Sequence, residues 1–304
     1  MQRQVNQTVL FTKPVHHLGL PLTPAQLAAE ARTFFEEKGL RVVFEKKVRG
    51  AELAARDVIK DHYLMYSRAA CITSAEELEL SDKAQARFES TFGKSWSAEA
   101  GKVMGSPSLQ QEKGISSHEL YLLWREQYSS RRTCKLQSGV IVAWLADLDC
   151  YCINAFYPVM EENFCNPVTE MDYLVMEFDP GQVSWLQFRR SILGATNASK
   201  SDSGSFRGRL FSTYGDALKF PGRDNFVHGS AGPLEGLVER IVHEPDFEMA
   251  ANPVGRHLLG RGIDLETFKR WKSGQSLLQL GRLFDATEEK DTADVLDLLD
   301  ETRF

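Results

Sequence analysis

The beginning of the chain alternates between short apolar runs and amphipathic stretches. Residues 8–12 predict a short buried strand, and residues 41–48 predict a second strand whose apolar part is Val42, Val43 and Phe44. Between them, Thr23 followed by Pro24 is typical of a helix N-terminus, and Gly39 is typical of a helix end. The predicted elements are a strand over 8–12, a helix over 24–38, a strand over 41–48 and a helical stretch over 50–66.

The same order of elements returns later in the chain. Residues 171–178 have the pattern of a strand, an Asp-Pro-Gly turn occupies 179–181, and residues 183–193 have the pattern of a helix. A last strand is predicted over 209–213 and a helix over 233–242. Two successive strand–helix–strand units predict an α/β (α+β) fold, with a ferredoxin-like antiparallel sheet and helices on one face.

A long insertion separates the two units. It combines helical patterns over 74–92 and 118–128, a turn-rich stretch over 101–114, and a hairpin of strands over 140–145 and 151–157. We interpret it either as a decoration packed on the core or as a lid or partner surface. The predicted organisation is a first part of the core domain over 1–70, the insertion over 71–166, the second part of the core domain over 167–243 and a C-terminal extension over 244–304.

The C-terminal extension has helical patterns over 263–271, 276–284 and 291–302. In the last of these, Val295, Leu296, Leu298 and Leu299 form an apolar stripe at helical spacing. Such a stripe either packs against its own domain or binds a protein partner.

Composition is that of a soluble globular protein, with 42% hydrophobic and 26% charged residues, so a core of useful size can form. The net charge of −6 argues against a general nucleic-acid binder, which would carry a basic surface. The N-terminus is polar and no apolar run could span a bilayer, so we expect a cytoplasmic protein without a membrane partner. The five cysteines lack a framework spacing and are expected to be reduced thiols.

The candidate chemistry centres on the segment from Asn225 to Ser230, which contains His228 and Gly229 and is followed by Glu239. An imidazole attacks phosphorus when it is neutral, oriented and accessible. Gly229 leaves the approach open, whereas Ser230 and Glu239 could hold the ring. Asn225 could bind a sugar hydroxyl or a phosphate oxygen. A single histidine in a loop is more often structural or solvated, so the neighbouring motifs decide its importance.

Three other motifs supply cations and a hydroxyl group. Lys13 ends the first predicted strand, Arg190 and Thr196 flank the turn after a predicted helix, and Arg207 lies between glycines. Arginine forks match the geometry of phosphate oxygens, and lysine adds a point charge. Such a set suits phosphoryl transfer, in which catalysis consists mostly of positioning the phosphate and neutralising its charge.

Taken in this order, the motifs resemble those of the nucleoside diphosphate kinase family, over about residues 8–66 and 171–243. The matching segments are Lys13-Pro14, His62-Tyr63, the Gly-x-Thr-Asn turn from Gly194 to Asn197, Phe206-Arg207-Gly208, the Asn-x-x-His-Gly-Ser motif from Asn225 to Ser230, and Glu239. Each motif alone is weakly specific, whereas the five motifs in the expected order, with the single residue Glu239 after them, are strongly specific.

The resemblance implies a role for each matching residue. His228 would take the γ-phosphoryl group of a nucleoside triphosphate such as ATP and pass it to a nucleoside diphosphate, in two ping-pong half-reactions. Ser230 and Glu239 would orient His228. The nucleotide-binding residues would be Lys13, Tyr63, Arg190, Thr196, Arg207 and Asn225. Mg²⁺ would be carried by the nucleotide phosphates, so no metal ligands are expected from the protein.

An alternative is a catalytically inactive module of the same kind that binds nucleotide or serves as a scaffold. It is favoured by the insertion, by the extension and by departures from the family pattern, such as Ala231 in place of aspartate and Ala198 in place of proline. The usual assembly of the family suggests a homo-oligomer, and the insertion or the extension could bind a protein partner. Three metal or phosphate motifs are set aside: the Cys150-x-Cys152 pair, His16-His17, and the incomplete P-loop over 194–201.

Overall fold

The computed structural model describes residues 5–218 and 222–304. The chain divides into two compact units. Unit 1 consists of Met1–Val58, Asn163–Ser273 and Ala286–Phe304, and unit 2 consists of Ile59–Glu162 and Gly274–Asp285. Unit 2 thus starts before the predicted insertion and also contains a short piece of the C-terminal region. Both units mix helices and strands, so the α+β class is confirmed.

Unit 1 is built on a four-stranded sheet with the order β2-β7-β1-β8. Its strands are β1 (Asn6–Thr12), β2 (Arg41–Arg49), β7 (Glu170–Phe178) and β8 (Val227–Gly229). All neighbouring strands are antiparallel. The predictions of strands over 8–12, 41–48 and 171–178 are confirmed. Helical segments connect strands that follow one another in sequence. In the sheet, β1 and β2 are not neighbours, because β7 lies between them.

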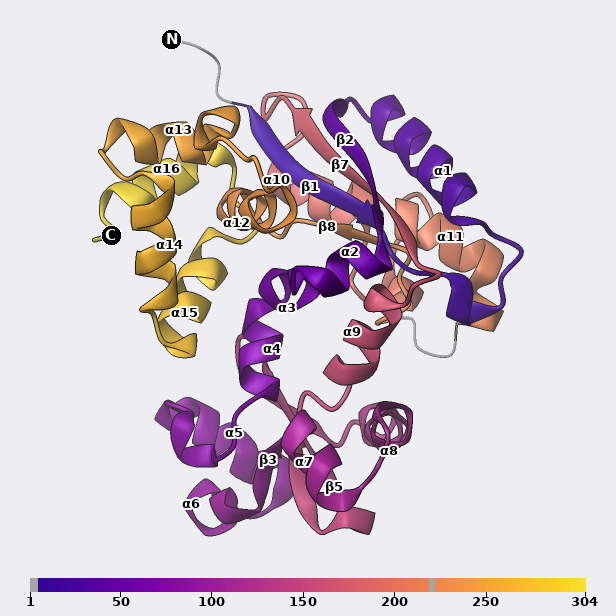
Figure 1. The fold of residues 1–304 in the computed structure, drawn as a ribbon, viewed down its shortest axis with the longest axis vertical. Coiled ribbons are helices and arrows are strands. Elements are labelled where there is room, and N and C mark those ends of the chain that lie inside the picture. Colours follow the sequence, from indigo (N-terminus) through magenta and orange to yellow (C-terminus); the bar gives the residue numbers. More distant parts are fainter. Residues whose placement is uncertain (1–4, 219–221) are drawn as a thin grey trace. The chain divides into compact units, whose positions relative to one another are not determined.

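Helices cover both faces of this sheet, and the prediction that they lie on one face is wrong. On one face, Leu10 and Met176 share a core with Phe35 of α1 (Pro24–Glu37). The side chains of a strand alternate between the two faces. On the opposite face, Phe11 contacts His243, the last residue of α12 (Pro233–His243). Figure 1 shows the strands between α1 and α12.

Local capping explains why α1 begins where the sequence predicts. The Thr23 hydroxyl accepts a hydrogen bond from the Gln26 amide at 3.2 Å, and the Gln26 side chain accepts one from the Thr23 amide at 2.9 Å. Pro24 occupies the first turn, where its missing N–H has no intrahelical role. Gly39 follows the helix with a φ of 87°, a left-handed conformation that glycine adopts without steric cost.

The predicted strand over 209–213 is wrong, because this segment belongs to the helix α11 (Phe206–Tyr214). The Ser205 side chain caps it by accepting from the Gly208 amide at 3.2 Å. Phe206 and Leu210 then lie one helical turn apart and both face the core. The last strand is β8 instead, which has only three residues and carries His228 itself.

Unit 1 contains further helical segments besides α1, α11 and α12. They are η1 (His16–Leu18), α2 (Gly50–Ala55), α10 (Trp185–Gln187), the π-helix η5 (Phe188–Leu193), η6 (Ala198–Lys200), η7 (Gly215–Ala217), η8 (Met249–Ala251), α13 (Pro253–Gly260), α14 (Leu265–Ser273) and α16 (Thr292–Asp300). The apolar residues Val295, Leu296 and Leu299 of α16 are buried, and α16 packs against α12 and α13. The apolar stripe of the extension therefore docks on its own unit.

Unit 2 has its own four-stranded sheet, with the order β3-β6-β5-β4. The strands are β3 (Val103–Gly105), β4 (Thr133–Gln137), β5 (Val140–Leu145) and β6 (Cys150–Ile153). Its helical segments are α4 (Leu64–Ala70), η2 (Ala75–Glu77), α5 (Asp82–Phe92), α6 (Trp96–Glu99), η3 (Ala100–Lys102), α7 (Ser106–Lys113), α8 (Ser117–Ser129) and η4 (Ala146–Leu148). The chain passes between the units within α3 (Val58–His62), α9 (Tyr157–Cys165) and α15 (Leu277–Thr287).

The prediction of an antiparallel hairpin from β5 and β6 and that of a helix over 118–128 are confirmed in unit 2. The turn-rich assignment of 101–114 is wrong, because β3 and α7 occupy that stretch and Pro107 lies in the first turn of α7, where proline is tolerated. In the part of the chain that the structure describes, no helix combines the length and the apolar character needed to cross a bilayer.

Candidate active site

His228 is held in the middle of β8 by its pairing with β1. Its cross-strand partner is Phe11, and the two rings stack with centroids 4.5 Å apart and planes inclined by 16°. The His228 side chain keeps 15% of its surface exposed, whereas Phe11 is fully buried. The aromatic ring therefore supports one face of the imidazole.

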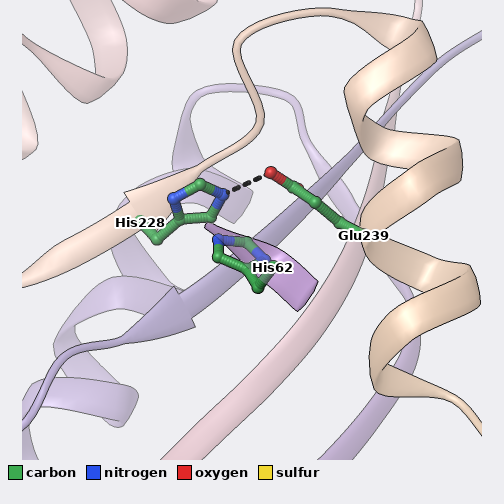
Figure 2. Close-up of side chains that lie close together, drawn as sticks. All are labelled: His62, His228 and Glu239. Carbon is green, nitrogen blue, oxygen red and sulfur yellow. Dashed lines mark hydrogen bonds and ion pairs between the residues drawn. The ribbon is translucent and has the colours of Figure 1, made fainter. Parts of the chain in front are cut away.

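His228 and Glu239 are joined by a hydrogen bond (Figure 2), and Ser230 extends this hydrogen-bonded set. The distance from His228 Nε2 to Glu239 Oε1 is 2.8 Å, and Ser230 Oγ donates to Glu239 Oε2 at 2.6 Å. Ser230 Oγ also accepts from the Val9 amide at 2.8 Å. The serine thereby connects the carboxylate of α12 to the backbone of β1, and the predicted catalytic residues are brought together.

A glycine allows α12 to approach the sheet closely enough for this contact. A Cβ atom added to Gly236 would lie 2.9 Å from the carbonyl oxygen of Gln7 in β1. Any side chain at this position would push the helix away from β1. Glu239 follows one turn later on the same helix, so its reach to His228 depends on the close contact at Gly236.

The hydrogen bonds define which ring nitrogen of His228 can react. The Glu239 carboxylate accepts the Ser230 hydroxyl, and as a carboxylate it accepts the Nε2–H of His228 as well. We assign the Nε2-protonated tautomer from this network. In that tautomer Nδ1 carries the lone pair, which makes it the nucleophilic atom of the ring.

The electrostatic surroundings keep the imidazole neutral. Burial, and after it the positive charges of Lys13, Arg207 and Arg189, hold the pKa of His228 well below its usual range. Burial, with the charge of Arg207 next, also lowers the pKa of Lys13 to about 7. A neutral imidazole beside two arginines and a lysine is suited to receive an anionic group.

Lys13 is positioned by the end of β1 and by the loop before β8. Its backbone amide donates to the Phe226 carbonyl at 2.7 Å, and its Nζ donates to the Arg223 carbonyl at 3.5 Å. Phe226 has a φ of 68°, which is unusual for a residue with a side chain and marks a sharp turn before β8. Asp224 accepts hydrogen bonds from the Arg223 guanidinium at 2.7 and 3.0 Å, which fixes this loop.

Asn225 joins the same loop to the turn that contains Thr196. Asn225 Nδ2 donates to the Thr196 carbonyl at 2.7 Å. Asn225 Oδ1 is buried and has no hydrogen-bond partner among the described residues. An acceptor in this state costs free energy until a donor reaches it, so a ligand hydroxyl would be a favourable partner. The Thr196 residue itself is exposed.

Arg207 is buried, with 3% of its surface exposed, and donates hydrogen bonds to the protein backbone. Its Nη1 donates to the Gly194 carbonyl at 2.9 Å, and its Nη2 donates to the Val227 carbonyl at 2.8 Å. It thus fixes the turn after η5 against β8, and its charge still acts on His228 and Lys13. The predicted residue is at the site, with a structural as well as an electrostatic contribution.

One predicted residue of unit 1, Arg190, is not brought to this set. The Arg190 side chain is 69% exposed, and its Nε and Nη2 donate to Glu289 Oε2 at 3.0 and 2.7 Å. Tyr63 belongs to unit 2, where its ring lies edge-on to that of His62, with centroids 4.5 Å apart. Sequence reasoning missed Phe11 and Arg189. The signal for Arg189 was its position next to Arg190, and for Phe11 its position two residues before Lys13, in the strand that Lys13 follows.

Comparisons with known proteins give distant similarities only. No family model matches the chain, and no curated protein matches it. Among solved structures, the chain is similar to a nucleoside diphosphate kinase from Encephalitozoon cuniculi, with 15% identity and a TM-score of 0.37 over 79% of this chain and 90% of that chain. It is similar to an NDP kinase from Pyrobaculum aerophilum, with 16% identity and a TM-score of 0.37 over 79% of this chain and 96% of that chain. At these values the function has to be argued from the residues of the site.

Proposed function

We propose that the chain is a nucleoside diphosphate kinase that transfers the γ-phosphoryl group of a nucleoside triphosphate, such as ATP, to a nucleoside diphosphate through phosphohistidine at His228. The observation that carries the proposal is the neutral imidazole of His228, fixed through Nε2 by Glu239 and surrounded by the charges of Lys13, Arg207 and Arg189. The motif resemblance in the sequence points to the same chemistry.

In the first half-reaction, the Nδ1 lone pair of His228 attacks the γ-phosphorus. A bond from Nδ1 to phosphorus forms while the bond from that phosphorus to the bridging oxygen breaks, and the nucleoside diphosphate leaves with the electron pair. Positive charge develops on the ring, and Glu239 stabilises it through Nε2–H. The second half-reaction reverses these steps with another diphosphate as the acceptor, so no net proton transfer is required.

The cations would neutralise the phosphate oxygens as the group moves. Lys13, with its pKa lowered to about 7, would regain its full charge when an anion binds beside it. Arg207 would act mainly through its charge, because two of its nitrogens already donate to the backbone. Asn225 Oδ1 would accept a hydroxyl of the nucleotide sugar, and the Thr196 hydroxyl would contact a phosphate.

Magnesium bound to the nucleotide would offset the negative charge of the phosphates. Glu239, the carboxylate beside His228, already forms hydrogen bonds with His228 and Ser230, which fits a metal that the nucleotide carries.

We also propose that the order β2-β7-β1-β8, with helical connections, represents a ferredoxin-like sheet to which α12 adds a helix on the second face.

An inactive nucleotide-binding or scaffolding module is the second candidate. It is favoured by the extent to which the arginines serve the protein itself, since Arg207 holds two backbone carbonyls and Arg190 is paired with Glu289. Under this alternative, nucleotide binds at Lys13 and Asn225 without transfer of a phosphoryl group.

The mass of the intact protein after brief incubation with magnesium ATP separates the two candidates. His228→Ala removes the nucleophile, and His257→Ala is a matched control, because His257 Nε2 also lies 2.7 Å from a carboxylate, Asp300 Oδ1, in unit 1. We expect the wild-type chain and His257→Ala to gain one acid-labile phosphoryl group and to lose it when a diphosphate is added. Phosphoryl uptake by His228→Ala would contradict the proposal, and nucleotide binding without uptake by the wild type would favour the inactive module.

A further inference from the structure

Two consecutive arginines, Arg189 and Arg190, point to different places from the π-helix η5. The turn closes by a hydrogen bond from the Gly194 amide to the Arg189 carbonyl at 3.2 Å, which spans one residue more than an α-helical bond. Consecutive side chains of a helix project in different directions. The structure thus separates two side chains that the sequence alone cannot distinguish.

Arg189 faces the histidine. Its Nη1 donates to the carbonyl of Gly229, the residue after His228, at 3.1 Å, and its charge contributes to the lowered pKa of His228. Its side chain is only 14% exposed, and its Nε is buried without a hydrogen-bond partner among the described residues. The nearest carboxylate contact is that of Glu288, 3.8 Å from Nη2, which is too long for a hydrogen bond. Donors of this guanidinium therefore remain for a ligand.

Arg190 faces the C-terminal segment 288–292. Besides its two hydrogen bonds to Glu289, the segment is fixed by the Glu289 amide, which donates to the Ala231 carbonyl at 2.9 Å. Within the segment, Asp291 Oδ1 accepts from the Trp185 amide at 2.7 Å and from Asn6 Nδ2 at 2.6 Å. Glu289 has a φ of 58°, so this backbone is held in a left-handed turn by the contacts around it.

We propose that the two arginines have divided roles: Arg189 binds the phosphoryl group that reaches His228, whereas Arg190 anchors the C-terminal segment 288–292 to η5. This inference rests on the proposed function of His228. It assigns the phosphate-binding role to a residue one position away from the one that the family pattern selects. It also gives Arg190 a structural task that requires the C-terminal extension.

Glu288 has a defined place in this division. Its side chain is 44% exposed, and its Oε1 lies 3.8 Å from Arg189 Nη2, close enough for an ion pair but not for a hydrogen bond. An incoming phosphate makes shorter, charge-assisted hydrogen bonds to a guanidinium than a carboxylate at 3.8 Å can. Phosphate binding would therefore displace Glu288 from Arg189 and leave the Arg190–Glu289 pair intact.

The test compares Arg189→Gln with Arg190→Gln, two neighbouring substitutions of the same chemistry. The first readout is the rate of phosphohistidine formation from magnesium ATP. The second is an NMR titration of the His228 ring nitrogens, with pH and with inorganic phosphate. We expect Arg189→Gln to slow phosphorylation by roughly 100-fold, to weaken phosphate binding by about tenfold and to raise the pKa of His228. Arg189→Lys should recover part of both losses.

Arg190→Gln should leave phosphorylation and phosphate binding within about twofold of the wild type, because Arg190 is paired with Glu289 and not with the site. It should lower the unfolding temperature by a few degrees, because the lost ion pair is exposed. The proposal is overturned if Arg190→Gln weakens phosphate binding as much as Arg189→Gln does, or if Arg189→Gln leaves it unchanged. A wild-type chain that takes up no phosphoryl group would remove the proposed function. Even then, the phosphate titration of the two variants would support or overturn the division of roles.

Discussion

Phe11 and His228 are cross-strand partners, and their rings stack with centroids 4.5 Å apart at an angle of 16°. Phe11 also contacts the His243 ring, whose centroid lies 5.5 Å away, and His243 in turn stacks on Tyr173 at 4.9 Å. The imidazole of His228 therefore packs against Phe11, the first of a series of buried rings that continues through His243 to Tyr173. This arrangement restricts the ring to one plane before any substrate arrives.

Replacing Phe11 tests whether this support affects reactivity. Phe11→Leu keeps an apolar side chain but removes the flat surface, so we expect phosphohistidine formation to slow by about tenfold, with a stability loss of roughly 1–2 kcal/mol. Mass spectrometry of samples quenched at successive times gives the rate of phosphorylation, and urea denaturation gives the free energy of unfolding. A variant with the expected loss of stability and an unchanged rate would show that the ring serves only as core packing.

Removing the carboxylate that holds the imidazole should have a larger effect. Glu239→Ala leaves Nε2–H without its acceptor and the developing positive charge without compensation, so we expect phosphorylation to slow by about 10²–10³-fold. Glu239→Gln retains an oxygen acceptor and should lose less. The order of the two variants is the informative measurement, and equal rates for Glu239→Ala and the wild type would refute the assigned tautomer.

Ser230 connects this carboxylate to β1, and its removal should affect both stability and rate. Ser230→Ala leaves the buried Val9 amide without its acceptor, which costs on the order of 1–3 kcal/mol. Glu239 also loses the donor on Oε2, so we expect phosphorylation to slow by roughly tenfold. Thermal unfolding and phosphorylation assays on the same sample separate the two effects.

The glycine contact between α12 and β1 gives a prediction with an internal control. Gly236→Ala would place Cβ 2.9 Å from the Gln7 carbonyl, so the helix must shift and carry Glu239 with it. We expect a loss of about 1–3 kcal/mol and slower phosphorylation. Gly260→Ala in α13 is the control, because no atom lies within 4 Å of its added Cβ. That control should be neutral or stabilising by up to about 1 kcal/mol.

Lys13 should make the stability of the fold depend on pH. Its folded-state pKa of about 7 lies below the ordinary value of 10.5, so between these values the unfolded chain binds more protons than the folded chain. The free energy of unfolding therefore rises with pH above about 7, by at most ~1.4 kcal/mol per pH unit. Below that pH Lys13 is protonated in both states, so it adds no pH dependence. Urea denaturation of the wild type and Lys13→Met at two alkaline pH values tests the sign. The free energy of unfolding of the wild type minus that of Lys13→Met should increase with pH. A value that stays constant between the two pH values would contradict the prediction.

The sequence predicts the parts of the fold that depend on local patterns. The strands β1, β2 and β7 each contain a short run of consecutive apolar residues, and α1 and α12 each begin at a proline. By contrast, β8 has three residues, too few for a periodic pattern, and exists because it pairs with β1. The helix α11 has apolar residues that fit a strand as well as a helix, and only the Ser205 cap and the core distinguish them.

The candidate site shows the same limit. The sequence pattern predicted a catalytic set of His228, Ser230 and Glu239, and the structure connects these three side chains by hydrogen bonds. The choice between Arg189 and Arg190 could not be made from the sequence, because it depends on the π-helical turn and on Glu289, 99 positions from Arg190. A pattern match fixes the residue type, whereas the direction of a side chain is set by contacts that are distant in sequence.

The sheet order has a consequence for synthesis of the chain. Both β1 and β2 pair with β7, and Asn6 lies opposite Phe178. During translation, β1 leaves the ribosome long before any strand that it pairs with, by roughly ten to thirty seconds at ordinary elongation rates. Throughout that interval the apolar β1 segment has no strand partner while unit 2 is being made. Early packing of β1 against α1 would bury apolar residues of this strand and lower its tendency to aggregate until β7 arrives.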